Sequence, residues 1–201
     1  MIVEVIAVGT ELLIGQIANT NAAFIGARLA EEGLDAHYQV TVGDNLDRLV
    51  MAIDDGLSRA DAIILTGGIG PTQDDLTREA MAHVAGLPMT RDAEHAAWIE
   101  ARVASQSGSV NPTVLRMADL PEGAQGLRNA NGVALGVALE HEGKWMFAVP
   151  GVPVEMRAMI DCEVMPRLRR LAGEATVLRS RLLRTWGIGE SSIAEALDDL
   201  F

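Results

Sequence analysis

Short apolar runs alternate with amphipathic segments through residues 1–85, and this order constrains the fold more than any other feature. The runs are mostly apolar, β-branched or aromatic and predict strands over Ile2–Val8, His37–Val42 and Asp61–Thr66. The amphipathic segments carry apolar residues at helical spacing and predict helices over Asn19–Glu32, Leu46–Leu57 and Asp74–Ala85. Strands and helices in this alternation predict a parallel sheet with helices on both of its faces.

The middle of the chain is less regular. Helical spacing predicts helices over Arg91–Ser105 and Pro153–Leu171, the second with a proline in its first turn. Two apolar runs, Val133–Glu140 and Lys144–Val149, flank a Glu-Gly pair and predict a β-hairpin. We therefore expect an α/β fold, a three-layer α/β/α sandwich with a mostly parallel sheet, over residues 1–172.

The C-terminal residues 173–201 predict the start of a second domain. Val177–Trp186 favours a strand and Glu190–Phe201 favours a helix, with no capping signal at its end. Domains below roughly 40 residues usually need additional support to fold. We therefore interpret this segment as a short α+β fragment of a truncated domain.

Charge and cysteine content limit the classes of partner. The chain carries 28 acidic and 16 basic residues, which gives a net charge of −12. This balance argues against nucleic-acid and anionic membrane partners, because both need clustered Lys and Arg. Cys162 is the only cysteine, and the sequence has neither a basic leader nor an apolar run of the roughly 18 residues that a membrane span needs. We expect a cytoplasmic protein.

A glycine-rich turn after the third predicted strand is the sharpest local feature. It reads TGGIGPTQDD over residues 66–75 and leads into a predicted helix. Ligands of open α/β sheets bind beyond the carboxyl ends of the strands. Glycines let the backbone come close to a ligand and present its N–H groups, which suits phosphate. The turn lacks the Lys-Ser/Thr of a P-loop and the third glycine of the dinucleotide fingerprint.

Asp74 and Asp75 stand in this turn, where they would repel a phosphate. The conflict disappears if a divalent cation lies between the carboxylates and the phosphate, because Mg²⁺ prefers one or two carboxylates together with substrate phosphates. The alternative interpretation is that both aspartates only cap the following helix. The sequence leaves the two interpretations open.

Two further loops end at the same edge of the predicted sheet. Gly9-Thr10-Glu11 follows the first strand, and Glu11 could bind a metal or orient water. Gly151 and Glu155 follow the last apolar strand, although a plain strand–turn–helix junction explains them equally well. Asp44 follows the second strand and is expected to cap the next helix.

These loops resemble motifs of the CinA (competence/damage-inducible) protein family, whose N-terminal domain is similar to molybdenum-cofactor biosynthesis domains of the MogA/MoaB type. The resemblance covers nearly the whole chain in the family's order. The segments that carry it are GTELLIGQ (Gly9–Gln16) with Asn19-Thr20-Asn21, TGGIGPTQDDLT (Thr66–Thr77), VPGVPVEM (Val149–Met156) and TWGIGES (Thr185–Ser191).

The resemblance implies a molybdopterin-binding type of fold and a hydrolase that cleaves ADP-ribose with a divalent metal, Mg²⁺ or Co²⁺, together with K⁺. It implies a homo-oligomer, either a dimer or a trimer, and a small linker domain beginning at residue 173. The family's nicotinamide-nucleotide amidase domain is not matched here, so deamidation is not expected. Carried over by position, the catalytic residues are Asp74, Asp75 and Glu11, with Asp74 and Asp75 as metal ligands. The implied ligand-binding residues are Thr10, Asn21, Thr66, Gly67, Gly68, Gly70, Gly151 and Glu155.

One segment departs from the family. Residues 129–136 read NANGVALG, with Ala130 and Leu135 where prolines are expected, and this predicts a looser ligand loop. Two other functions remain open on the sequence: a molybdopterin-binding or adenylyl-transfer module, and a non-catalytic domain that senses a ligand. The same glycine turn and aspartates would serve the first of these, and the second needs no metal.

Overall fold

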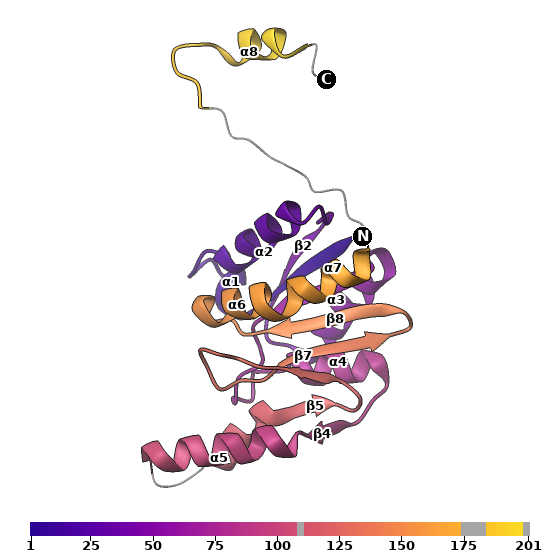
Figure 1. The fold of residues 1–201 in the computed structure, drawn as a ribbon, viewed down its shortest axis with the longest axis vertical. Coiled ribbons are helices and arrows are strands. Elements are labelled where there is room, and N and C mark those ends of the chain that lie inside the picture. The colour runs from indigo at the N-terminus through magenta and orange to yellow at the C-terminus, as the bar shows by residue number, and fades with distance from the viewer. Residues whose placement is uncertain (108–110, 174–183, 199–201) are drawn as a thin grey trace.

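The apolar runs of the first third become neighbouring parallel strands in the centre of one sheet. A computed structural model describes residues 1–107, 111–173 and 184–198 (Figure 1). The sheet has the order β2-β1-β3-β8-β7-β6, in which β7 is antiparallel to its neighbours and the other strands share one direction. Its strands are β1 (Val3–Val8), β2 (Gln39–Val42), β3 (Ala62–Thr66), β6 (Gln125–Leu127), β7 (Gly136–His141) and β8 (Lys144–Val149). The mostly parallel sheet and the predicted hairpin are confirmed.

Alternate residues of each central strand enter two separate cores. Val3 and Val5 of β1 belong to the core on one face, whereas Ile6 and Val8 belong to the core on the other. Because both faces are covered, the strands are apolar nearly throughout. Glu4 interrupts β1 and is buried, and its two carboxylate oxygens accept hydrogen bonds of 2.8 and 2.7 Å from Arg59.

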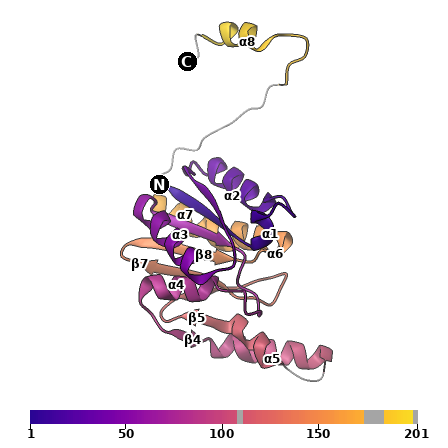
Figure 2. The same ribbon diagram turned by 180° about the vertical axis from the view of Figure 1, so that it is seen from behind.

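Helices cover both faces and complete the three layers. One face carries α2 (Thr20–Glu31), α6 (Pro153–Met159) and α7 (Met165–Ala172), seen in Figure 1. The opposite face carries α3 (Leu46–Arg59) and α4 (Thr77–Ala85), seen from behind in Figure 2. Asn19 caps α2 by accepting a hydrogen bond from the Ala22 N–H. The α/β/α architecture predicted from the sequence is confirmed, and it is the frame that positions the loops at the sheet edge.

The single helix predicted over Pro153–Leu171 contains a π-helical turn, η2 (Ile160–Val164), between α6 and α7. Pro166 lies in the first turn of α7 and explains the interruption. A proline has no N–H to donate to the carbonyl four residues earlier, and its ring clashes with that carbonyl. The preceding turn widens instead, as π-turns inside helices do.

Several short elements carried no periodic signal. These are α1 (Thr10–Leu13), the 3₁₀ helix η1 (Pro112–Ala118) and a two-stranded sheet of β4 (Met89–Arg91) and β5 (Asp119–Pro121). The predicted helix over Arg91–Ser105 is α5 (Ala93–Ser107). The prediction that α4 begins at Asp74 is wrong, because the helix begins at Thr77.

At the C-terminus, α8 (Glu190–Ala196) forms within the helix predicted over Glu190–Phe201. Most of the strand predicted over Val177–Trp186 lies outside the described residues. Within the part of the chain that the structure describes, no helix is both long and apolar enough to cross a membrane.

Candidate functional site

The glycine turn is held from behind by the start of α4. The carbonyl oxygens of all four residues of loop 67–70 accept hydrogen bonds from Thr77 or Arg78. Thr77 donates its hydroxyl to Gly67 at 2.8 Å and its N–H to Gly68 at 3.0 Å. Arg78 donates Nη1 to Ile69 at 2.7 Å and Nη2 to Gly70 at 2.8 Å. The turn therefore has a fixed conformation with its carbonyl groups directed into the protein.

The glycines of this turn are required by geometry. Gly67 and Gly68 have φ of 104° and 66°, in a region that side chains with a Cβ rarely adopt. A Cβ on Gly67 would lie 2.4 Å from the backbone oxygen of Val8, so the neighbouring strand β1 also excludes a side chain. Among the described residues, the N–H groups of Gly68, Ile69 and Gly70 have no hydrogen-bond acceptor.

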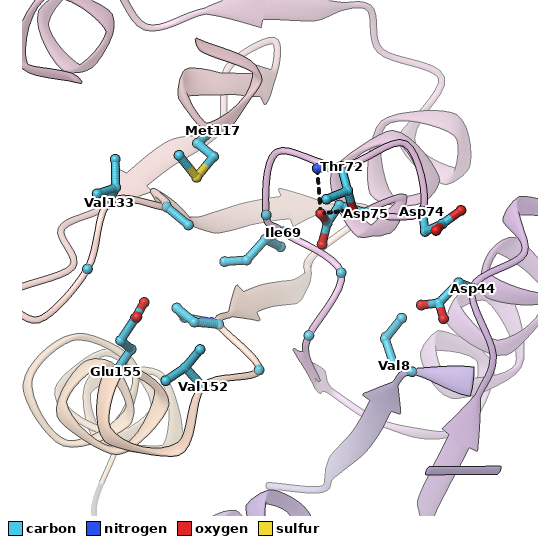
Figure 3. Close-up of a pocket in the computed structure, with 18 of the residues that line it drawn as sticks. Val8, Asp44, Ile69, Thr72, Asp74, Asp75, Met117, Val133, Val152 and Glu155 are labelled. Carbon is cyan, nitrogen blue, oxygen red and sulfur yellow. Dashed lines mark hydrogen bonds between the residues drawn. The ribbon is translucent and has the colours of Figure 1, made fainter. Parts of the chain in front are cut away.

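A cleft of about 650 Å³ opens in front of the turn, at the carboxyl edge of β1, β3 and β8. Figure 3 shows the glycine loop crossing it, with Asp44 and Asp74 on one side and Val152 and Glu155 on the other. This volume is typical of small-molecule sites. Most of the residues expected at the site line it: Glu11, Gly67, Gly68, Gly70, Asp74, Asp75, Gly151 and Glu155.

The other three expected ligand-binding residues do not line the cleft, and each bonds to a residue that does. Thr10 donates both its N–H and its hydroxyl to the carboxylate of Asp44, at 2.9 and 2.8 Å. The hydroxyl of Thr66 donates to the carbonyl of Pro150 at 3.1 Å. Asn21 donates to the carbonyl of Gly151 at 2.8 Å and to the Thr66 hydroxyl at 3.1 Å. Thr10 thus joins the loop after β1 to the loop after β2, whereas Thr66 and Asn21 join the end of β3 to the loop after β8.

The two aspartates of the turn differ in their surroundings. Asp75 accepts hydrogen bonds from the N–H and the hydroxyl of Thr72 with the same oxygen, Oδ2, at 2.8 and 2.6 Å. The exposed carboxylate of Asp74 has no hydrogen-bond partner within the described chain. The N-cap of α4 is Leu76, with no side-chain hydrogen bond, so the helix-capping interpretation of both aspartates is wrong. Asp44 does not cap α3 either, because Asn45 does so through the Arg48 N–H.

The cleft is strongly acidic. The described lining contains no Lys or Arg. Five carboxylates line the cleft: Glu11, Asp44, Asp74, Asp75 and Glu155. Arg78 lies directly behind the turn, where burial lowers the pKa of its guanidinium from the ordinary value. Nowhere in the described residues do three His, Cys, Asp or Glu side chains form a ready-made metal cage. An anionic ligand would meet free N–H groups on one wall and uncompensated carboxylates beside them.

The segment that departs from the family pattern forms the far wall of the cleft. Asn129 donates to Glu155 Oε2 at 2.6 Å, and Asn131 donates to the carbonyl of Val154 at 3.3 Å. Leu135 is buried. This segment lacks the expected prolines, and hydrogen bonds to α6 fix its position instead.

Arg78 is the functional candidate that the sequence prediction missed. Its signal was present, because it shares the apolar face of α4 with Met81 and Ala82, at positions i+3 and i+4. A basic residue on the buried face of an amphipathic helix needs an internal partner.

Comparison with known proteins agrees with this architecture. Residues 4–170 match the family described as "Probable molybdopterin binding domain". A "Putative competence-damage inducible protein" of Caldicellulosiruptor bescii is 46% identical over 200 residues, which are 100% of this chain and 48% of that relative. The chain thus spans about half the length of the curated relatives it matches.

Two solved structures are also similar. One is CinA from Thermoplasma acidophilum, described as of unknown function, with 35% identity and a TM-score of 0.76 over 83% of this chain and 96% of that one. The other is the molybdopterin biosynthesis enzyme MoaB of Thermus thermophilus, with 18% identity and a TM-score of 0.57 over 86% of this chain and 97% of that one. At this identity, the second likeness concerns the fold alone.

Proposed function

The chain belongs to the CinA family, with a domain of the molybdopterin-binding type, and we propose that it hydrolyses the pyrophosphate of ADP-ribose or a related dinucleotide with the help of a divalent cation. The observation that carries the proposal is that hydrogen-bond donors and carboxylates line one and the same cleft. Three N–H groups without acceptors in the described structure face a ring of carboxylates that has no basic side chain among its lining residues.

A divalent cation resolves this electrostatic conflict. Phosphate oxygens beside Asp74 and Asp75 would be repelled by roughly 4 kcal/mol per charge pair at 4 Å in a surface environment. Asp74 is without a hydrogen-bond partner in the described chain, and Oδ1 of Asp75 is likewise unengaged there. Two open carboxylates fit Mg²⁺, which completes its coordination with water and substrate phosphates.

Each group at the cleft then has a role. The N–H groups of residues 68–70 bind one phosphate and stabilise the charge that develops on it. Asp74 and Asp75 hold the cation, which when bound would neutralise phosphate charge and lower the pKa of water. Glu11 is exposed beside Gly9 and orients the attacking water. Water attacks one phosphorus and the P–O–P bond breaks. AMP and ribose 5-phosphate leave, and two protons are released when both phosphates are fully ionised.

The test is product analysis by chromatography after incubation of the folded protein with ADP-ribose and Mg²⁺ or Co²⁺. The expected result is AMP and ribose 5-phosphate in equal amounts, with none formed in EDTA. Absence of AMP with every divalent ion would refute hydrolysis. In that case, calorimetric binding of molybdopterin but not of ADP-ribose would favour the pterin function that the family description names.

A further inference from the structure

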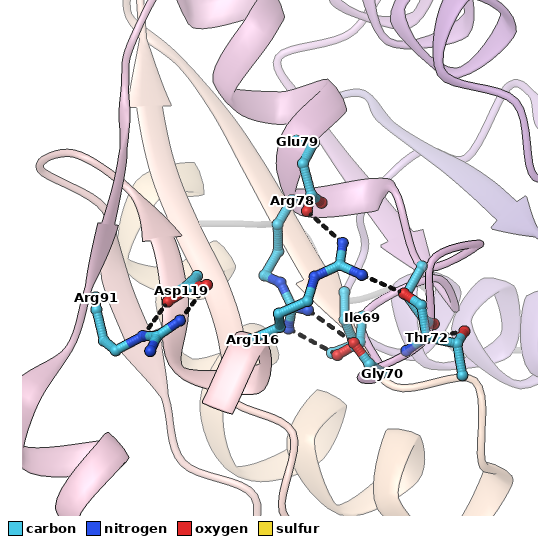
Figure 4. Close-up of polar contacts among 9 residues, drawn as sticks. Ile69, Gly70, Thr72, Arg78, Glu79, Arg91, Arg116 and Asp119 are labelled. Atoms are coloured by element: carbon cyan, nitrogen blue, oxygen red, sulfur yellow. Dashed lines mark hydrogen bonds and ion pairs between the residues drawn. The ribbon is translucent and has the colours of Figure 1, made fainter. Parts of the chain in front are cut away.

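Arg78 is the largest fully buried side chain of the described residues, and it lies directly behind the glycine turn. Figure 4 shows its guanidinium reaching the carbonyls of Ile69 and Gly70, while Arg116 and Arg91 lie nearby. Its Nε atom is buried and has no hydrogen-bond partner in the described part of the chain. Burying a cation that bonds only to neutral carbonyls costs folding free energy. A role in ligand binding would explain why the chain keeps such a residue.

The contacts of Thr77 and Arg78 determine where the N–H groups of the turn point. No peptide bond of the described residues is cis. In a trans peptide the C=O and the next N–H point in opposite directions. Because the carbonyls of residues 67, 68 and 69 are directed at α4, the N–H groups of Gly68, Ile69 and Gly70 are directed away from it. Three successive N–H groups of this kind form an anion-binding concavity.

The three arginines of this region differ in how their charge is balanced. Arg91 forms two hydrogen bonds with the carboxylate of Asp119, at 2.6 and 2.9 Å. Arg116 bonds to the carboxylate of Glu79 at 2.8 Å and to the carbonyl of Thr72 at 2.7 Å. Among the described residues, no carboxylate forms an ion pair with Arg78. Of the three arginines, Arg78 is therefore the one whose charge has no ion-pair partner in the described chain.

We propose that Arg78 is a positioning residue that sets the anion affinity of the glycine turn, by directing the Gly70 N–H into the cleft and by supplying an unpaired positive charge behind the two N–H groups that Thr77 directs. The ligand class is a phosphate or pyrophosphate group seated on these N–H groups. This inference rests on the proposed function only in placing the substrate's phosphate there. It explains how a cleft lined by carboxylates and by no basic side chain, within the described residues, can still hold an anion.

The test compares variants that separate charge from hydrogen bonding. Inorganic pyrophosphate with Mg²⁺ is titrated calorimetrically into the wild type, Arg78→Lys, Arg78→Gln and the matched control Arg91→Gln. Hydrogen bonds to charged groups support a loss of about 10- to 100-fold in affinity for Arg78→Gln. Arg78→Lys keeps the charge but loses the planar fork, and it should lose less affinity than Arg78→Gln. Arg91→Gln should bind as the wild type does, because the Arg91 side chain bonds to Asp119 and not to the turn.

A second measurement uses the unmodified protein and remains decisive if Arg78→Gln does not fold. Amide resonances of Gly68, Ile69 and Gly70 should shift downfield when pyrophosphate is added, because these groups become hydrogen-bond donors. Unshifted amides, equal losses in Arg78→Lys and Arg78→Gln, or wild-type affinity in Arg78→Gln would each overturn the proposal. Intact pyrophosphate binding without ADP-ribose hydrolysis would overturn only the proposed function.

Discussion

Two glycines with nearly the same φ make it possible to measure the close packing behind the site. Gly68 has φ of 66° and Gly86, at the C-terminal end of α4, has φ of 65°. A Cβ on Gly68 would lie 2.3 Å from the hydroxyl oxygen of Thr77, whereas a Cβ on Gly86 would meet nothing within 4 Å. Replacing each by alanine therefore imposes a similar backbone cost, and the two variants differ mainly in the collision.

The magnitudes follow from the contacts. A left-handed backbone costs a residue with a Cβ about 1–2 kcal/mol, and we expect this loss in unfolding free energy for Gly86→Ala. In Gly68→Ala the Thr77 hydroxyl must also move, which breaks its 2.8 Å bond to the carbonyl of Gly67. A buried carbonyl left without its partner adds about 1–3 kcal/mol. Gly68→Ala should therefore lose about 2–5 kcal/mol in total.

Urea unfolding followed by circular dichroism measures both losses, provided that the slope of the transition is unchanged. The double variant Gly68→Ala/Thr77→Ala supplies the control, because it removes the Thr77 hydroxyl with which the new Cβ would collide. Its loss should be smaller than the sum of the two single losses by about 1 kcal/mol or more. Equal losses for Gly68→Ala and Gly86→Ala, or strict additivity in the double variant, would refute the packing of the turn against α4.

Three further predictions concern single contacts. Asp74→Asn should leave the unfolding free energy within about 0.5 kcal/mol of the wild type and raise the Mg²⁺ concentration needed for half-maximal AMP release about tenfold or more. Asn129→Ala removes the hydrogen bond to Glu155 and should lower the unfolding free energy by about 1 kcal/mol in urea. The hydrogen bond from Arg169 holds the pKa of Glu32 below its usual 4.5, so NMR titration of Arg169→Gln should show that pKa raised. The stability lost in Arg169→Gln should be seen above pH 4.5 and should vanish as the pH falls through the lowered pKa.

The sequence predicted the centre of the fold because its strands are buried on both faces. Runs such as residues 61–66 have few other places to lie, and parallel strands bring the loops that follow them to one edge. The convergence of Glu11, Gly68 and Glu155 on one cleft follows from that topology.

The other features of the fold and the site depend on contacts between residues that are distant in sequence, or on a charged residue that the sequence pattern places at the surface. The pairing of β4 with β5 joins three-residue segments about 30 positions apart, which leave no periodic pattern. Asp74 and Asp75 lie before α4 because Thr77 is bonded back to the turn, and this fixes the first helical residue. Arginine is usually a surface residue, and only the position of Arg78 on the apolar face of α4 indicates that it is buried.

The claim on which the account depends is that a cation joins the carboxylates to an anion seated on the glycine turn. Anomalous diffraction from crystals grown with ADP-ribose and Mn²⁺ tests it directly. The account predicts a Mn²⁺ peak between the Asp74 carboxylate and a phosphate that accepts hydrogen bonds from the N–H groups of residues 68–70. A phosphate bound elsewhere, or one on the turn with no Mn²⁺ beside Asp74, would contradict it.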